Sequence, residues 1–287
     1  MKQNIHLLVI DPQNDFCDLP ASWRAQDPLS GAMLAPALPV AGAHADMLRL
    51  AALIDGGAAG LAAISITLDS HHRYDIAHPT FWHTGDGGAV APFTSITAAQ
   101  VRAGDYAPAD PSAGPRALAY LDELERRGRY TLMVWPVHCE IGSWGHNIHA
   151  AVKAACNRWE DSRLALVQKI SKGSNPWTEH YSAMQAEVPD EDDASTWLNV
   201  PLIAQLDGAD VIVIAGEASS HCVRATTEHI AANLPSGRTG KIVLVTDCMS
   251  PVGGFEAQHQ AFLDDMQARG VMLTSSAALL PQLLANA

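Results

Sequence analysis

The stretch from Val211 to Val223 constrains the fold of this chain more than any other. Its first part, 211–214, is an unbroken β-branched run, which is typical of a strand buried on both faces of a parallel sheet. Gly216 interrupts the run, and after Cys222 the apolar residues recur at helical spacing. The sequence therefore predicts a cysteine at the point where a buried strand turns into a helix.

A cysteine at that point has two interpretations. Backbone N–H groups at a helix start have no intrahelical acceptor and carry partial positive charge, which favours a thiolate nucleophile and a developing oxyanion. Most free cysteines, however, are small buried hydrophobic residues. The spacing around Cys222 does not decide between them, and the rest of the chain has to.

Strands and helices alternate along the rest of the chain. The predicted strands are 6–10, 62–67, 131–134, 164–167, 211–214 and 241–246. The predicted helices are 41–54, 116–127, 143–156, 198–206, the segment after Cys222, and 255–268, and the segments 271–274 and 277–284 finish the chain. This alternation predicts a three-layer, doubly wound α/β fold with a six-stranded, mostly parallel sheet and helices on both faces.

The length of 287 residues fits one large domain, 1–287, better than two. Residues 84–113 are rich in Gly, Pro, Ala and Asp, and we interpret them as a long insertion that forms a lid or an oligomer contact.

Charge and composition exclude several classes of function. The formal net charge of −13 disfavours a nucleic-acid surface and binding to anionic membranes. No apolar run approaches the length of a membrane span, and the start of the chain lacks signal-peptide architecture. The five cysteines form no CxxC pair, which suits reduced thiols in a cytoplasm. Neither GxGxxG nor GxxxxGK[ST] is present, so a nucleotide-binding site has no support.

Polar residues follow the predicted strands at the edge where doubly wound sheets place their chemistry. Each has an ordinary interpretation, as a turn residue, a surface histidine or a solvated lysine. Together they supply a nucleophile, a carboxylate, a cation and metal-type ligands, and this convergence favours the nucleophile interpretation of the cysteine. The residues are Asp11, Asp69, His71, His138, a lysine of the 169–172 segment, and Cys222.

Five motifs spread over most of the chain carry a resemblance to a known family. They are DPQNDF at 11–16, DSH at 69–71, WPVHC at 135–139, KG at 172–173 with YSA at 181–183, and GEASSHCV at 216–223. With these motifs the chain resembles the isochorismatase-like cysteine hydrolases, and among them it is most similar to the nicotinamidases.

The resemblance implies a catalytic triad of Cys222 as nucleophile, Asp11 as base and Lys172, with Lys169 as the alternative lysine in another register. It also implies a cis peptide between Glu217 and Ala218, and an oxyanion hole formed by the N–H groups of Ala218 and Cys222.

The same resemblance implies a metal site and an aromatic pocket. Asp69, His71 and His138 would hold one divalent transition metal, Zn, Fe or Mn, and His78 is a possible fourth ligand. Aromatic walls around a flat substrate ring would come from Phe16, Trp135 and Tyr181.

These features lead us to expect an amidohydrolase that converts nicotinamide to nicotinate and ammonia through a thioester. The alternatives are another small-amide hydrolase, for a carbamoyl or maleamate-type substrate, and a non-catalytic binding protein. The metal ligands weigh against an isochorismatase proper, which would cleave a vinyl ether without needing them. We also expect a role in NAD salvage, a homo-oligomer, a cytoplasmic location, and neither nucleic acid nor membrane as a partner.

Overall fold

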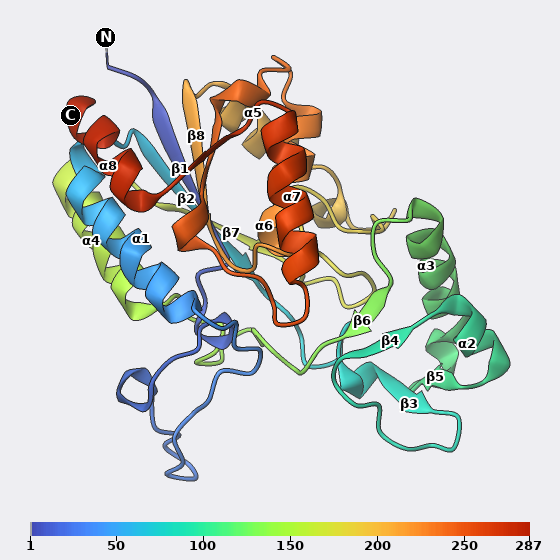
Figure 1. The fold of residues 1–287 in the computed structure, drawn as a ribbon. Coiled ribbons are helices and arrows are strands. Elements are labelled where there is room, and N and C mark those ends of the chain that lie inside the picture. Colours follow the sequence, from blue (N-terminus) through green and yellow to red (C-terminus); the bar gives the residue numbers. More distant parts are fainter. Residues whose placement is uncertain (1) are drawn as a thin grey trace.

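The computed structural model describes residues 2–287, and its centre is a sheet of six parallel strands (Figure 1). In spatial order β10-β9-β8-β1-β2-β7, the strands are β10 (Met272–Thr274), β9 (Ile242–Val245), β8 (Val211–Gly216), β1 (Ile5–Ile10), β2 (Ala63–Asp69) and β7 (Gln168–Lys172). The central strands β1 and β8 are buried along nearly their whole length, as their continuous apolar sequences predict.

Helices cover both faces of this sheet. One face carries α1 (Ala43–Gly57), α4 (Ala150–Arg163) and α8 (Ser276–Ala285), and the other carries α5 (Val200–Asp207), α6 (Cys222–Asn233) and α7 (Glu256–Ala268) (Figure 1). The predicted three-layer α/β fold is therefore confirmed. None of the helices within residues 2–287 is long and apolar enough to cross a membrane.

The structure corrects two of the predicted strands of the central sheet. The segment 131–134 is not the third strand of the central sheet, because β6 (Leu132–Val134) pairs antiparallel with β4 (Thr94–Ile96) in a separate two-stranded sheet. The central sheet still has six strands, because β10 belongs to it and was not among the six predicted strands. A three-residue apolar run carries no information about which partner it pairs with.

The segment 164–167, in contrast, is not a strand. Leu164 ends α4 in a left-handed conformation, and Leu164 and Leu166 are 93% and 88% exposed. The strand is β7, which begins at Gln168 and lies at the edge of the sheet. Most of its residues are not buried, so its sequence, QKISK, lacks the apolar run that the prediction relied on.

The helix predicted at 143–156 begins instead at Ala150. The residues before it pair with the loop after β1, where Asn14 donates its backbone N–H to the oxygen of Asn147 at 2.9 Å and Asp15 donates to Gly145 at 3.1 Å. This tertiary pairing outweighs the local helical pattern.

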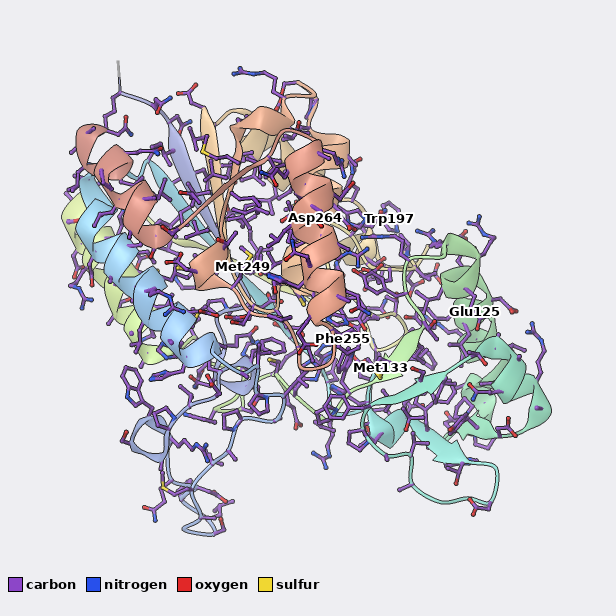
Figure 2. All side chains as sticks on the ribbon, viewed as in Figure 1. Glu125, Met133, Trp197, Met249, Phe255 and Asp264 are labelled. Atoms are coloured by element: carbon purple, nitrogen blue, oxygen red, sulfur yellow. The ribbon has the colours of Figure 1, made fainter. Side chains whose placement is uncertain are left out.

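The segment predicted as an insertion, 84–113, is folded and belongs to a second, smaller apolar core beside the sheet (Figure 1). Its elements are β3 (Trp82–Thr84), β4, α2 (Ala98–Ala103), β5 (Tyr106–Pro108), α3 (Gly114–Arg127) and β6. Phe81, Ile96, Leu121 and Val134 are fully buried in this core. Met133 and Phe255, labelled in Figure 2, line a hollow where the smaller core meets the loop before α7.

The order of the strands places a switch point between β1 and β8. From β1 the chain adds β2 and β7 on one side, and it then returns to add β8, β9 and β10 on the other. At such a point the loops leave the carboxyl ends of the two strands in opposite directions and open a crevice between them. Asp11 and the segment 217–222 follow these two strands directly.

The crevice requires glycine at the end of β8. Gly216 has φ of 122°, and a Cβ there would lie 2.0 Å from the carbonyl oxygen of Ile10.

We therefore expect Gly216→Ala to lower the free energy of unfolding by about 3 kcal/mol or more, as measured by urea denaturation. The control is Gly87→Ala, since Gly87 also has positive φ but has nothing within 4 Å of its added Cβ. That variant should lose only about 1 kcal/mol, and equal losses would contradict the close approach as the cause.

Candidate active site

A buried lysine joins the ends of three strands. Lys172, the last residue of β7, places its Nζ 3.0 Å from Asp11 Oδ2 and 2.9 Å from Asp69 Oδ1. The same Nζ lies 3.7 Å from Cys222 Sγ and donates to the backbone oxygen of His180 at 2.9 Å. The structure therefore brings together the three residues predicted as the triad. Lys169, the alternative lysine, is half exposed and faces Glu160 at 3.8 Å.

Asp11 is held by a threonine that sequence reasoning missed. Thr67 of β2 donates its hydroxyl to Asp11 Oδ1 at 2.5 Å and accepts the Asp11 backbone N–H at 3.0 Å. Asp11 itself adopts φ of 42°, a conformation that Asp tolerates better than most residues. The only signal that could have found Thr67 is the register of β1 on β2, which pairs Val9 with Ile66.

The charges of the cluster leave the thiol protonated at rest. Burial raises the pKa of the Cys222 thiol well above its usual range, and Lys172 counteracts this only in part because Asp11 and Asp69 are also close. Burial also raises the pKa of Asp11, against the effect of Lys172. Burial would lower the pKa of Lys172, but the two carboxylates outweigh it and hold that pKa well above its usual value. One cation thus serves two carboxyl groups, and a thiolate forms only if a neighbouring base takes its proton.

Two backbone N–H groups beside the thiol are available as donors. Cys222 is the first residue of α6, and the peptide between Glu217 and Ala218 is cis, as the resemblance implied. Within residues 2–287 the structure gives no acceptor for the N–H of Ala218 or of Cys222. The backbone oxygen of Ala218, by contrast, is hydrogen-bonded and accepts the backbone N–H groups of His221 and Val223, each at 3.1 Å.

The three predicted metal ligands lie next to one another. Asp69 Oδ2 is 3.2 Å from His71 Nε2 and 3.3 Å from His138 Nε2. Gln13, another residue that sequence reasoning did not single out, holds the backbone of Asp69 through its side-chain amide. Its Oε1 accepts the Asp69 N–H at 2.7 Å, and its Nε2 donates to the Asp69 backbone oxygen at 2.8 Å. Asp69 therefore presents one carboxylate oxygen to Lys172 and the other to the two imidazoles.

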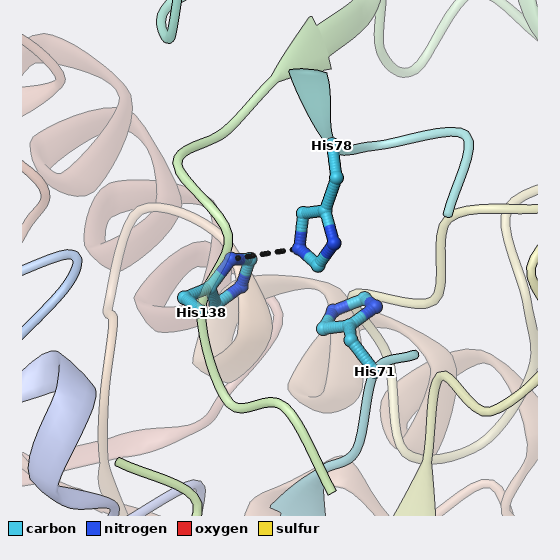
Figure 3. A group of neighbouring side chains, drawn as sticks. All are labelled: His71, His78 and His138. Atoms are coloured by element: carbon cyan, nitrogen blue, oxygen red, sulfur yellow. Dashed lines mark hydrogen bonds between the residues drawn. The ribbon is translucent and has the colours of Figure 1, made fainter. Parts of the chain in front are cut away.

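His78 joins the same group, so the residue left open by the sequence is close enough to be a ligand. The ligand atoms of His71, His78 and His138 all lie within 4.8 Å of one another, and His78 Nε2 is 3.3 Å from His138 Nδ1 (Figure 3). Asp75 Oδ2 lies 3.0 Å from His71 Nδ1 and leaves Nε2 of that ring facing Asp69. A carboxylate behind a histidine is the usual support of a metal ligand, so this donor set fits a divalent transition ion.

A small pocket connects the thiol with the metal-type ligands. The three aromatic residues predicted to bind substrate all line it, and Trp135 Nε1 donates to the Tyr181 hydroxyl at 3.0 Å. Glu179, which was not predicted, also lines it and has a buried Oε2 without a hydrogen-bond partner among residues 2–287. The lining residues are Phe16, Leu38, Asp69, Trp135, His138, Glu179, Tyr181, Ala218, His221, Cys222 and Val252.

The charge balance around Lys172 leads to a stability prediction. Lys172→Met leaves Asp11 and Asp69 buried without their cation, so we expect it to lower the free energy of unfolding by about 3–5 kcal/mol. Lys169→Met is the matched control, since it removes a half-exposed lysine from the same strand. Its effect in the same urea titration should stay within about 0.5 kcal/mol. A larger loss of stability for Lys169→Met than for Lys172→Met would indicate that Lys169 is the buried cation.

The comparisons with known proteins rest on structure alone, because no protein-family model and no curated protein matches the sequence. A nicotinamidase/pyrazinamidase from Acinetobacter baumanii matches with a TM-score of 0.60 and 18% identity, over 96% of this chain and 98% of that one. The yeast nicotinamidase bound to the inhibitor nicotinaldehyde matches with a TM-score of 0.61 and 18% identity, over 94% and 99% of the two chains.

A pyrazinamidase from Pyrococcus horikoshii in complex with zinc also matches, with a TM-score of 0.52 and 18% identity over 95% of this chain and 99% of that one. All three are matched over nearly their full length. At this level of identity the likeness concerns the fold. The chain therefore has the fold shared by nicotinamidases and pyrazinamidases, the isochorismatase-like fold that its motifs predicted.

Proposed function

We propose that this chain is a cysteine amidohydrolase that cleaves a small aromatic carboxamide, with nicotinamide as the first candidate. The observation that carries the proposal is the position of Lys172 Nζ, within 3.0 Å of Asp11 and 3.7 Å of the Cys222 thiol at the wall of a small apolar pocket. The nicotinamidases and pyrazinamidases that share the fold support the same class of reaction.

The reaction would begin with proton transfer from Cys222 to Asp11. Burial raises the pKa of the thiol, and the neighbouring Asp11 carboxyl group adds to that effect, so the thiol would lose its proton only to an adjacent base such as Asp11. Lys172 would then stabilise the thiolate, because its ammonium no longer faces an ionised Asp11. The sulfur attacks the amide carbon and forms a C–S bond, while the electron pair of the carbonyl moves onto oxygen.

The resulting oxyanion would accept hydrogen bonds from the N–H groups of Ala218 and Cys222. When the intermediate collapses, the C–N bond breaks and Asp11 returns its proton to the departing ammonia. A water molecule then attacks the thioester with Asp11 as base, which releases the carboxylic acid and restores the thiol. Removing one oxyanion donor typically costs about 3–4 kcal/mol of barrier, so both donors matter to the rate.

The pocket favours a flat substrate with few polar atoms. Trp135, Tyr181 and Phe16 offer ring faces and edges, and the mutual hydrogen bond of Trp135 and Tyr181 leaves both rings apolar toward the pocket. Asp69, His71, His138 and His78 would hold the metal, which when bound would orient a ring nitrogen of the substrate. A hydroxylated aliphatic amide would place its hydroxyl groups against these rings, where they find no hydrogen-bond partner.

A non-catalytic binding protein on this fold has less support. Burying one ammonium, two carboxyl groups and a thiol in contact is costly in free energy, and the geometry serves proton transfer rather than ligand affinity.

The substrate and the nucleophile can be tested together. The purified protein should release ammonia from nicotinamide and pyrazinamide, and Cys222→Ala should lower kcat by about 10⁴-fold or more without unfolding. Iodoacetamide followed by intact-mass spectrometry should modify Cys222 first, since its thiol lines the pocket and lies 3.7 Å from Lys172 Nζ. The other four cysteines are buried and do not line the pocket, so they should react later.

Two results would contradict the proposal. Release of ammonia only from aliphatic amides would retain the hydrolase and exclude the nicotinamidase assignment. An active Cys222→Ala variant, with Cys139 or Cys248 alkylated first, would exclude the nucleophile.

The metal site is tested by elemental analysis. We expect about one divalent transition ion per chain, strongly reduced in His71→Ala and His138→Ala, and reduced in His78→Ala as well. His83→Ala is the control, because His83 belongs to the same histidine-rich segment but not to the cluster. Chelation should raise KM and lower kcat while iodoacetamide still alkylates Cys222. Full activity in chelator, or unchanged metal content in the variants, would contradict this assignment.

A further inference from the structure

Two buried carboxyl groups lie behind the candidate oxyanion donors, and the proposed reaction uses neither. Glu217 follows β8 and Asp46 lies in the first turn of α1, and they are 0% and 2% exposed. Ser250 connects them, since its backbone N–H donates to Glu217 Oε2 at 3.0 Å and its hydroxyl donates to Asp46 Oδ2 at 2.6 Å. The three residues come from distant parts of the sequence and meet on one side of the crevice.

This arrangement fixes the peptide that carries the Ala218 N–H from both sides. On one side Glu217 accepts from Ser250 through its side chain and donates its own N–H to the oxygen of Ile10 at 2.8 Å. On the other side the N–H of Ser219 donates to the oxygen of Ser250 at 2.9 Å. Ala218 is therefore positioned by its two neighbours, and both of them depend on Ser250.

In the described part of the chain, only one member of the pair has a cation beside it, and that member is Asp46. The Arg49 guanidinium donates to Asp46 Oδ1, whereas no ion pair involves Glu217 within residues 2–287. Glu217 Oε1 is buried and has no partner if the group is ionised, but as a protonated acid it can donate to Asp46. Burial, followed by the nearby Asp46, raises the pKa of Glu217 well above its usual range. A buried carboxylate without a cation is costly, so the proton stays on Glu217.

The remaining groups that face the pair do not change this balance. The carboxylate of Asp18 is occupied at the start of α1, where it accepts the backbone N–H groups of Gly42 and His44 at 2.9 and 2.8 Å. Burial raises the pKa of the Cys17 thiol well above its usual range, and Glu217 adds to that effect, so this thiol is neutral. Within residues 2–287 Arg49 is the only cation that contacts the pair.

We propose that Glu217 is a positioning residue, a neutral carboxylic acid that acts with Asp46 and Ser250 to hold the Ala218 N–H where the substrate oxygen becomes an oxyanion. Its effect on turnover rests on the proposed function, while its protonation can be tested without any substrate.

The first test compares the melting temperature of Glu217→Gln with that of the natural protein across pH. The unfolded chain releases the Glu217 proton above its ordinary pKa but the folded protein keeps it, so the natural protein loses stability as the pH rises. Gln carries no such proton, and its amide can donate to Asp46 and accept from Ser250. The two melting temperatures should be close at about pH 5, and the variant should be several degrees more stable at about pH 8.

Glu191→Gln is the control, because Glu191 is an exposed carboxylate. Its melting-temperature difference from the natural protein should stay nearly constant with pH. If Glu217→Gln behaves like this control, or loses stability relative to the natural protein as the pH rises, Glu217 is ionised and the proposal is wrong.

The second test separates positioning from general damage. Glu217→Ala should lower kcat by about 10²-fold with little change in KM, because the oxyanion forms only after binding. Alkylation of Cys222 by iodoacetamide should keep its rate, since this displacement creates no oxyanion. Glu217→Gln should recover most of the lost kcat.

Two results would overturn the positioning role: a Glu217→Gln variant as slow as Glu217→Ala, or an alkylation rate that falls together with kcat. A natural protein that hydrolyses no amide would refute the proposed function, and the melting temperatures would still decide whether Glu217 is protonated.

Discussion

The ion pair network of Lys172 with Asp11 and Asp69 is the constraint on which the rest of the site depends. The three residues stand at the ends of three adjacent strands, β1, β2 and β7, and all are buried. Charges in such a place are stable only when their geometry is accurate, because removal of one partner leaves the others uncompensated. The parallel sheet supplies that accuracy, since its register aligns the strand ends. The thiol of Cys222 then meets this network from the other side of the switch point.

Much of this site follows from the sequence by one physical rule. Polar residues that follow buried parallel strands meet at one edge, so Asp11, Asp69 and Cys222 could be placed together without coordinates. The edge strand β7 escaped detection because its residues are mostly exposed and carry no apolar run, and only its last residue, Lys172, is fully enclosed. Thr67 and Asp75 were missed for a different reason. Their roles arise from register and loop geometry, which leave no pattern in the sequence.

His138 was predicted to lie next to Asp69 and does so, but the predicted placement of the strand before it was wrong. It was placed at the end of a strand of the central sheet, but β6, the strand before it, belongs to the smaller core and pairs with β4. The segment 135–139 reaches the site from outside the central sheet. The backbone N–H of Trp135 holds it there by donating to the backbone oxygen of Ala77 at 2.8 Å. Phe93, from the segment before β4, packs edge-on against Trp135 with ring centroids 5.9 Å apart. The folded insertion therefore supports one wall of the pocket, although the sequence suggested only a lid or a contact between subunits.

Asp69 ties the two halves of the site together. Its Oδ1 faces the Lys172 ammonium and its Oδ2 faces the imidazoles of His71 and His138, so the lysine and the histidines share one carboxylate. A cation among the histidines would withdraw electron density from Asp69 and weaken its hold on Lys172. Lys172 would then be freer to stabilise a thiolate on Cys222, only 3.7 Å from its Nζ. The thiol of Cys222 and the metal-type ligands are thus electrostatically linked through a single buried side chain, Asp69.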